Sequence, residues 1–143
     1  MIFSIYNFYR DRQITKQHTS THGKYRVLKS RNISSNYVID IPNYDCFINN
    51  IEQFNVKKIL KSNSIAIPNL SYLPRACFLP KDTISDGSVA LLHAKNGFII
   101  TKNDLAYYSS HEFRNFYMIG RNYSTRSLNI DGNSISLFGV KQE

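Results

Sequence analysis

Residues 111–140, HEFRNFYMIGRNYSTRSLNIDGNSISLFGV, decide how the rest of this chain is interpreted. Phe113, Phe116, Tyr117 and Gly120 follow one another at spacings of three, one and three, which places them on one face of a helix. Ser109, with Glu112 three residues later, fits a capping box at the start of that helix. The segment therefore predicts an amphipathic helix that packs against a globular core.

The second half of the same stretch predicts a β-hairpin. Apolar residues alternate over 128–130 and again over 135–137, on either side of Asp131-Gly132. An Asp-Gly pair favours a tight turn because both positions tolerate positive φ. Between helix and hairpin lies a basic, hydroxyl-rich segment, GRNYSTR at 120–126, which we expect the two elements to project from the surface.

The pattern continues toward the N-terminus. Asn96-Gly97 separates apolar runs at 88–93 and 98–101, which predicts a second hairpin. Residues 102–104 resemble a helix cap, and the spacing of apolar residues over 44–61 predicts a helix broken near Asn55. Short strands are expected at 24–29, 36–41, 65–67 and 75–79, and a loop is expected at 81–87. The fold class is α+β, a mostly antiparallel sheet built from hairpins with a few packed helices.

The charge of the chain favours a polyanionic partner. With 143 residues, 42% of them apolar, it is long enough for one domain with a core of Phe, Ile and Leu. The formal net charge is +8 and the pI is about 9.6, so nucleic acid is the first expectation and an anionic membrane the second.

Much of this charge lies in residues 1–31, which hold seven lysines and arginines against one aspartate. Aromatic residues alternate with the basic ones there, and such an arm can track phosphates and stack on bases. A poorly ordered, solvated N-terminus is an equal alternative. We divide the chain into this arm at 1–31 and an α+β domain at 32–143.

Several classes of protein are not expected. Cys46 and Cys77 lack a CxxC partner and are interpreted as buried free thiols in a reducing compartment. No run of 18 apolar residues exists, and the apolar first nine residues are too short for a signal sequence, so we expect a cytoplasmic protein without a membrane partner. His93 and His111 form no recognised nucleophile–base pair, and phosphate-cradling glycine motifs are absent.

Residues 121–127 instead offer the chemistry of recognition. Arginine binds guanine bidentately in the major groove, asparagine does the same for adenine, and hydroxyls bind phosphates. The alternative is a polar loop whose arginines pair with Asp131 or Glu112.

Five blocks, taken in order, resemble a known family: PRACFLP at 74–80, DGSVA at 86–90, DLAYY at 104–108, EFRNFY at 112–117 and RNYSTRSLNID at 121–131. They resemble the C-terminal target-recognition region of bacterial restriction–modification adenine-specific (N6) DNA methyltransferases. The resemblance covers about half of the chain and does not include the first 70 residues.

The resemblance implies sequence-specific binding of double-stranded DNA, beside a methyltransferase catalytic subunit that flips the target adenine and uses S-adenosylmethionine. This chain has neither the glycine-rich cofactor motif nor the Pro-Pro catalytic motif of that family. We therefore expect no cofactor or metal in it and no catalysis by it alone, as in a separate subunit, a fragment or half of a split enzyme. The candidate DNA-binding residues are Arg114, Arg121, Asn122, Tyr123, Ser124, Thr125, Arg126, Ser127, Lys95 and Asn96.

Two other functions stay open at this point. The basic N-terminus also suits a stand-alone module that binds RNA or single-stranded nucleic acid through stacking on tyrosines. A small toxin-like or nuclease-like enzyme would need a charged cluster that only the fold assembles.

Overall fold

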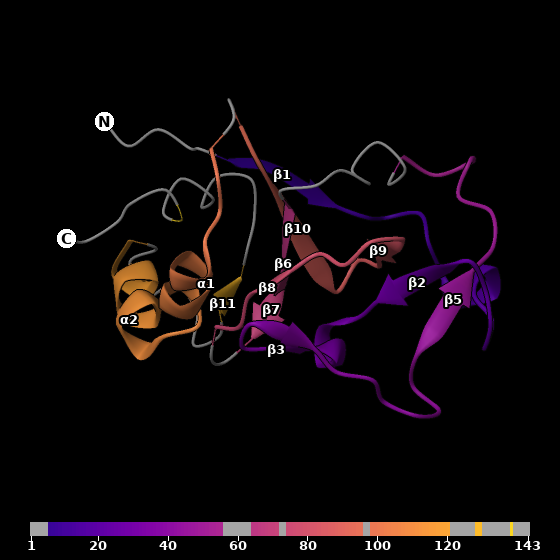
Figure 1. Ribbon diagram of the computed structural model, residues 1–143, viewed down its shortest axis with the longest axis horizontal. Coiled ribbons are helices and arrows are strands. Elements are labelled where there is room, and N and C mark those ends of the chain that lie inside the picture. The colour runs from indigo at the N-terminus through magenta and orange to yellow at the C-terminus, as the bar shows by residue number, and fades with distance from the viewer. Residues whose placement is uncertain are drawn as a thin grey trace.

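The described part of the chain has an α+β fold with several small, mainly antiparallel sheets and two α-helices. Figure 1, a computed structural model, shows the helices gathered at one end and the strands β2 and β5 at the other. The structure describes residues 6–55, 64–71, 74–95, 98–120, 128–129 and 138.

The central sheet has four strands in the order β1, β10, β6 and β8, with every neighbouring pair antiparallel. Their bounds are Tyr6–Arg10, Val89–Ala94, Ser64–Pro68 and Cys77–Phe78. β10 and β6 lie between neighbours on both sides and are almost wholly buried, which explains why both are continuous apolar runs rather than alternating ones. The strands expected at 65–67, 75–79 and 88–93 are confirmed.

The hairpin expected at Asn96-Gly97 is wrong. β10 uses both of its edges, one for β1 and one for β6, so no edge is left for residues 98–101. Residues 98–101 form no strand; Ile100 is buried in the core, whereas Ile99 is 73% exposed. The turn pair itself lies outside the described residues. The Asn-Gly signal is local. It gives no information about strands from distant parts of the chain that pair with the edges of β10.

A second sheet has three strands, β5, β2 and β9, at Cys46–Ile48, Tyr25–Leu28 and Thr83–Ser85. β2 pairs antiparallel with β5 and parallel with β9, with Val27 opposite both Cys46 and Ile84. The strand expected at 24–29 is confirmed, and the loop expected at 81–87 contains β9.

The helix expected over 44–61 is wrong as far as residue 55, and residues 56–61 lie outside the described residues. Residues 46–48 are extended because they pair with β2. Ile48, Ile51 and Phe54 do share one buried cluster, but the chain brings them there through turns. These side chains, spaced by three residues, therefore lie in one cluster although the chain that connects them is not an α-helix.

Shorter elements complete the described chain. A small hairpin pairs β3 with β4, and its turn holds Asn36 at a φ of 74°. Of the strand expected at 36–41, only the two residues of β4 are extended as a strand. β11 pairs with β7, while the rest of the hairpin expected over 128–137 lies outside the described residues. These elements are η1 (Lys16–His18), η2 (Ser30–Asn32), β3 (Ile33–Ser34), β4 (Tyr37–Val38), β7 (Leu70–Ser71) and β11 (Leu128–Asn129).

The two α-helices are capped one residue away from the expected positions. α1 spans Lys102–Tyr108, and Thr101 is its cap: the Asp104 N–H donates to Thr101 Oγ1 at 3.2 Å, and the Thr101 N–H donates to Asp104 Oδ2 at 2.9 Å. α2 spans His111–Gly120, and the Phe113 N–H donates to Ser110 Oγ at 3.0 Å. Ser109, the expected cap, instead accepts a hydrogen bond from the Ala76 N–H at 3.1 Å.

The core against α2 is aromatic, as the helical spacing predicted. Phe113 and Tyr117 are buried, and the ring centroids of Phe113 and Phe138 lie 4.8 Å apart. The Tyr108 hydroxyl lies 2.8 Å from the Tyr6 hydroxyl and donates to the Phe138 carbonyl oxygen. Burial raises the pKa of Tyr6 to about 12.

Residues 6–31 supply β1 and β2 to the two larger sheets, with Tyr6 fully buried. The boundary placed after residue 31 stays a prediction. Over the described residues, neither α-helix has the length and apolar character needed to cross a membrane.

Both cysteines are free thiols, as expected, but they differ in burial. Burial raises the pKa of Cys77 to about 12, and it also raises that of the half-buried Cys46. We expect iodoacetamide to alkylate Cys46 slowly in the folded protein and Cys77 only after unfolding, as read by peptide mass spectrometry. Labelling in denaturant is the control, and equal labelling rates in the folded protein would contradict the burial of Cys77.

Candidate nucleic-acid interface

The structure describes two of the ten candidate DNA-binding residues. Arg114 lies half-buried on α2, one turn after the helix start, and its N–H donates to the Ser110 carbonyl at 3.1 Å. Lys95 is half-buried directly after β10, and its carbonyl accepts from the Phe98 N–H at 2.9 Å. Asn96 and all of 121–127 lie outside the described residues, so the expected DNA-reading segment stays a prediction.

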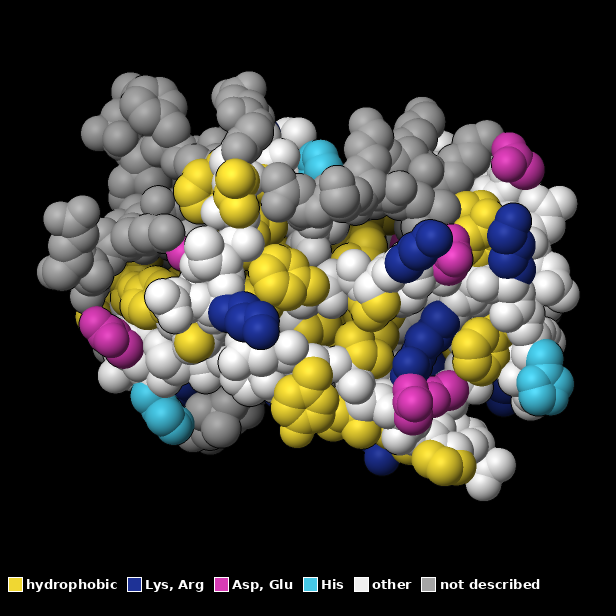
Figure 2. Space-filling model, viewed as in Figure 1, with side chains coloured by type: hydrophobic (Ala, Val, Ile, Leu, Met, Phe, Trp, Pro, Cys, Tyr) yellow, Lys and Arg dark blue, Asp and Glu magenta, His cyan; other side chains and the backbone are white. Residues whose placement is uncertain are grey.

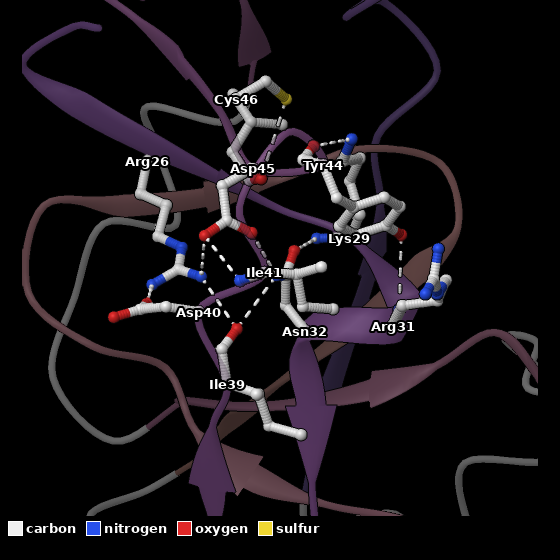
Figure 3. A network of polar contacts seen from close by, with 11 residues as sticks. Arg26, Lys29, Arg31, Asn32, Ile39, Asp40, Ile41, Tyr44, Asp45 and Cys46 are labelled. Carbon is white, nitrogen blue, oxygen red and sulfur yellow. Dashed lines mark hydrogen bonds and ion pairs between the residues drawn. The ribbon is translucent and has the colours of Figure 1, made fainter. Parts of the chain in front are cut away.

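A polar network that the sequence did not reveal lies next to β2 and β5, around Asp45 (Figure 3). Asp45 Oδ2 accepts from Arg26 Nη2 at 3.2 Å and from the Ile41 N–H at 3.0 Å, and its Oδ1 accepts from Asn32 Nδ2 at 2.6 Å. The side chains of Asp45 and Arg26 are 16% and 18% exposed, so the ion pair is well shielded from water.

The network fixes the loop at 39–45. Arg26 Nη2 and Asn32 Nδ2 each donate to the Ile39 carbonyl at 3.0 Å, and Arg26 Nη1 also pairs with the exposed Asp40 at 2.5 Å. Asn43 adopts a φ of 66°, in the left-handed region that asparagine tolerates better than most residues. The loop leads into β5. Because these contacts hold the loop in place, they also hold Tyr44, which lies within it.

Tyr44 holds two cations in place. Lys29 Nζ lies 3.8 Å from the centre of the Tyr44 ring and donates to the Tyr44 carbonyl at 2.5 Å. The Arg31 guanidinium lies 4.8 Å from the same ring, and the Arg31 N–H donates to the Tyr44 hydroxyl at 3.4 Å. These partners are neutral, so both positive charges are oriented without being neutralised.

A cavity of about 540 Å³ opens beside this cluster. Ile14 and Val27 are its apolar residues, and Lys29 and Tyr44 line it together with Lys16 from η1. Its remaining lining is polar: Thr15, Thr19, Ser20, Thr21, Asn43, Asp45, Cys46 and Asp86.

The two carboxylates in this lining already have partners. Asp45 is bound in the network described above, and Asp86 Oδ1 accepts from the N–H and the hydroxyl of Ser88 at 2.9 and 2.5 Å. The lining itself holds two lysines and two carboxylates. With Arg26, Arg31 and Asp40 next to these residues, the cluster carries one positive charge in excess, which suits an anion better than a cation.

From the sequence, only the basic residues of this site could be expected to take part in binding. Lys16, Lys29 and Arg31 belong to the basic segment noted at 1–31, whereas Tyr44 and Asp45 fall at the start of the helix expected over 44–61. No local pattern reveals that Asp45 reaches Arg26 and Asn32, because the contact depends on the register between β2 and β5.

Neither a metal site among the described residues nor a known family adds to this description. Among the described residues, no three His, Cys, Asp or Glu side chains are grouped closely enough to hold a metal ion. No protein-family model matches the chain, and a search of curated proteins finds no significant match.

Proposed function

We propose that this chain binds double-stranded DNA in a sequence-specific manner as the target-recognition part of a restriction–modification adenine-N6 DNA methyltransferase. The five sequence blocks support the family, and the distribution of charge in the fold supports a polyanionic ligand. S-adenosylmethionine and the methyl transfer belong to a companion catalytic subunit.

The observation that carries the proposal is that exposed cations outnumber exposed acids in the described part of the chain, because several acids are buried or half-buried. Asp11 and Asp104 are buried, and Asp45 and Asp86 are half-buried. Asp11 Oδ2 accepts from the N–H groups of Gln13 and Ile14 at 3.1 and 2.7 Å, so its charge stabilises a turn. Several acidic residues thus act inside the fold, where they hold loops and a helix start.

Four acidic residues of the described part of the chain are also exposed, namely Asp40, Glu52, Asp82 and Glu112, but six exposed lysines and arginines outnumber them. These exposed cations are Arg12, Lys16, Lys24, Arg31, Lys81 and Lys102. Figure 2 shows lysine and arginine side chains spread over this face, more of them toward the end that carries β2 and β5. A surface of this kind attracts the phosphate backbone and steers association.

The placement of the aromatic residues favours duplex over single strands. Tyr6 is fully buried, with its hydroxyl bound to Tyr108, and the Tyr9 hydroxyl donates to Asp11 Oδ1 at 3.3 Å. Tyr6 therefore offers no ring on which a base can stack, and Tyr9 packs in part against two core clusters. These two tyrosines of β1 thus give little support to the single-strand alternative.

We expect Arg121→Ala and Arg126→Ala each to reduce discrimination between the target and a mismatched duplex by about 1–3 kcal/mol, as loss of one bidentate guanine contact requires. The measurement is competition binding over a randomised duplex library, followed by titration of the selected site. Arg12→Ala, which removes an exposed arginine outside the predicted reading segment, is expected to weaken all duplexes alike.

Equal affinity of the wild-type chain for all duplexes would contradict the proposal, and a preference for single strands would favour the alternative. Deleting residues 1–31 is not a usable test, because the deletion removes β1 and β2 from their sheets. Point substitutions of exposed residues keep the fold intact.

A further inference from the structure

We infer that the cavity beside Tyr44 is a phosphate-binding site in which Lys16 and Lys29 contact the anion. The inference rests on the proposed function in one respect, since it takes the backbone of duplex DNA as the source of the phosphate. The cavity is lined by Val27 of β2 and Cys46 of β5, and Figure 1 places these strands at the opposite end of the molecule from α2.

The charges around the cavity leave a positive surplus. Four cations, Lys16, Lys29, Arg26 and Arg31, stand against three carboxylates, Asp40, Asp45 and Asp86, which leaves one positive charge in excess. The hydrogen bonds from Ser88 hold one oxygen of Asp86 without removing its charge. Lys29 is held by a carbonyl oxygen and an aromatic ring, which leave its full charge in place. Lys16 is exposed on η1 and lines the same cavity. An anion between the two ammonium groups meets a net attraction.

The lining also offers hydrogen-bond donors. An ammonium group has three donors, of which the Tyr44 carbonyl takes one from Lys29, and the amide of Asn43 supplies two more. Arg31 is not part of the lining, but it lies over the ring of Tyr44, which is, and its planar guanidinium suits two phosphate oxygens.

The site is organised before the ligand arrives. Lysine and arginine side chains lose rotamer freedom when they bind, which opposes binding by flexible surface cations. Here the Tyr44 ring already limits the rotamers of Lys29 and Arg31, and the Asp45 network holds the loop that carries Tyr44. Phosphate contacts of this kind fix the position of a protein on a duplex, while base contacts elsewhere supply specificity.

The first arm of the test is an NMR titration of the full chain with inorganic phosphate. We expect the amide signals of Thr19, Ser20 and Thr21 to shift, and Lys16→Gln to weaken the apparent affinity about tenfold, as loss of one charge-assisted hydrogen bond implies. Lys102→Gln is the matched control, because Lys102 is equally exposed but lies on α1, outside the cavity lining. Lys29→Gln serves as a second variant, with a thermal melt to show that the Tyr44 loop persists.

The second arm replaces phosphate with a short duplex. If a backbone phosphate occupies the cavity, the same amides shift and Lys16→Gln reduces the slope of log K against log salt by about 1. Amide shifts with inorganic phosphate but not with a bound duplex would support the site and identify its ligand as a small phosphate compound.

The inference is overturned if inorganic phosphate and duplex both leave the three amides unshifted, or if Lys16→Gln and Lys102→Gln behave alike. Failure of the proposed function has a different signature. In that case the wild-type chain does not bind duplex, while phosphate still titrates the cavity.

Discussion

Asp45→Ala is expected to lower the free energy of unfolding by about 2–3 kcal/mol, because it removes one side of a shielded ion pair and leaves its partners unmatched. Arg26 would retain a largely buried charge, and Asn32 and the Ile41 N–H would each lose an acceptor. Urea unfolding followed by circular dichroism measures the change.

Asp40→Ala is the matched control, since Asp40 pairs with the same guanidinium but its side chain is 83% exposed. An exposed pair contributes less than about 1 kcal/mol, so this variant should unfold close to the wild type. If the two substitutions destabilise the protein equally, the network around Asp45 does not hold the loop. The same comparison also tests whether the network keeps the cavity in shape, because Tyr44 lies on this loop and lines the cavity.

Tyr108→Phe is expected to cost about 2–3 kcal/mol of stability with almost no change in side-chain volume. The Tyr108 hydroxyl lies between the hydroxyl of Tyr6 and the carbonyl of Phe138, all inside the core. Removing it leaves two buried polar groups without this partner, and each such group carries a desolvation penalty. Chemical denaturation gives the free energy, and near-ultraviolet circular dichroism reports whether the aromatic packing survives.

Tyr6→Phe tests the same chain of hydrogen bonds from its other end. This substitution removes one bond but leaves the Tyr108 hydroxyl donating to Phe138, so a smaller cost of about 1 kcal/mol is expected. A larger loss from Tyr6→Phe than from Tyr108→Phe would show that the hydroxyl of Tyr108 is not the central link.

Some of the fold could be predicted because its signals are local. The apolar face of α2 follows from the spacing of Phe113 and Tyr117, and the buried runs of β6 and β10 follow from composition alone. The α+β class was predicted correctly, since short apolar runs alternate with turn residues along most of the chain.

Pairing between distant segments could not be predicted in this way. Nothing near Asn96 shows that β1 already pairs with the edge of β10 that a hairpin would use. Likewise, residues 46–48 have the apolar content of a helix face, and only their pairing with β2 makes them a strand. The candidate site depends on that same pairing, which places Asp45 against Arg26 and Tyr44 against Lys29.

The pairing of β1 also has a consequence for how the protein is made. Tyr6 lies 102 residues before the tyrosine whose hydroxyl it meets, and its strand pairs with one formed only by residues 89–94. During synthesis the first strand leaves the ribosome long before its partner exists, so it stays unpaired while most of the domain is translated. Such non-local pairing slows folding and leaves the edge of β1 accessible to other chains until β10 has been synthesised.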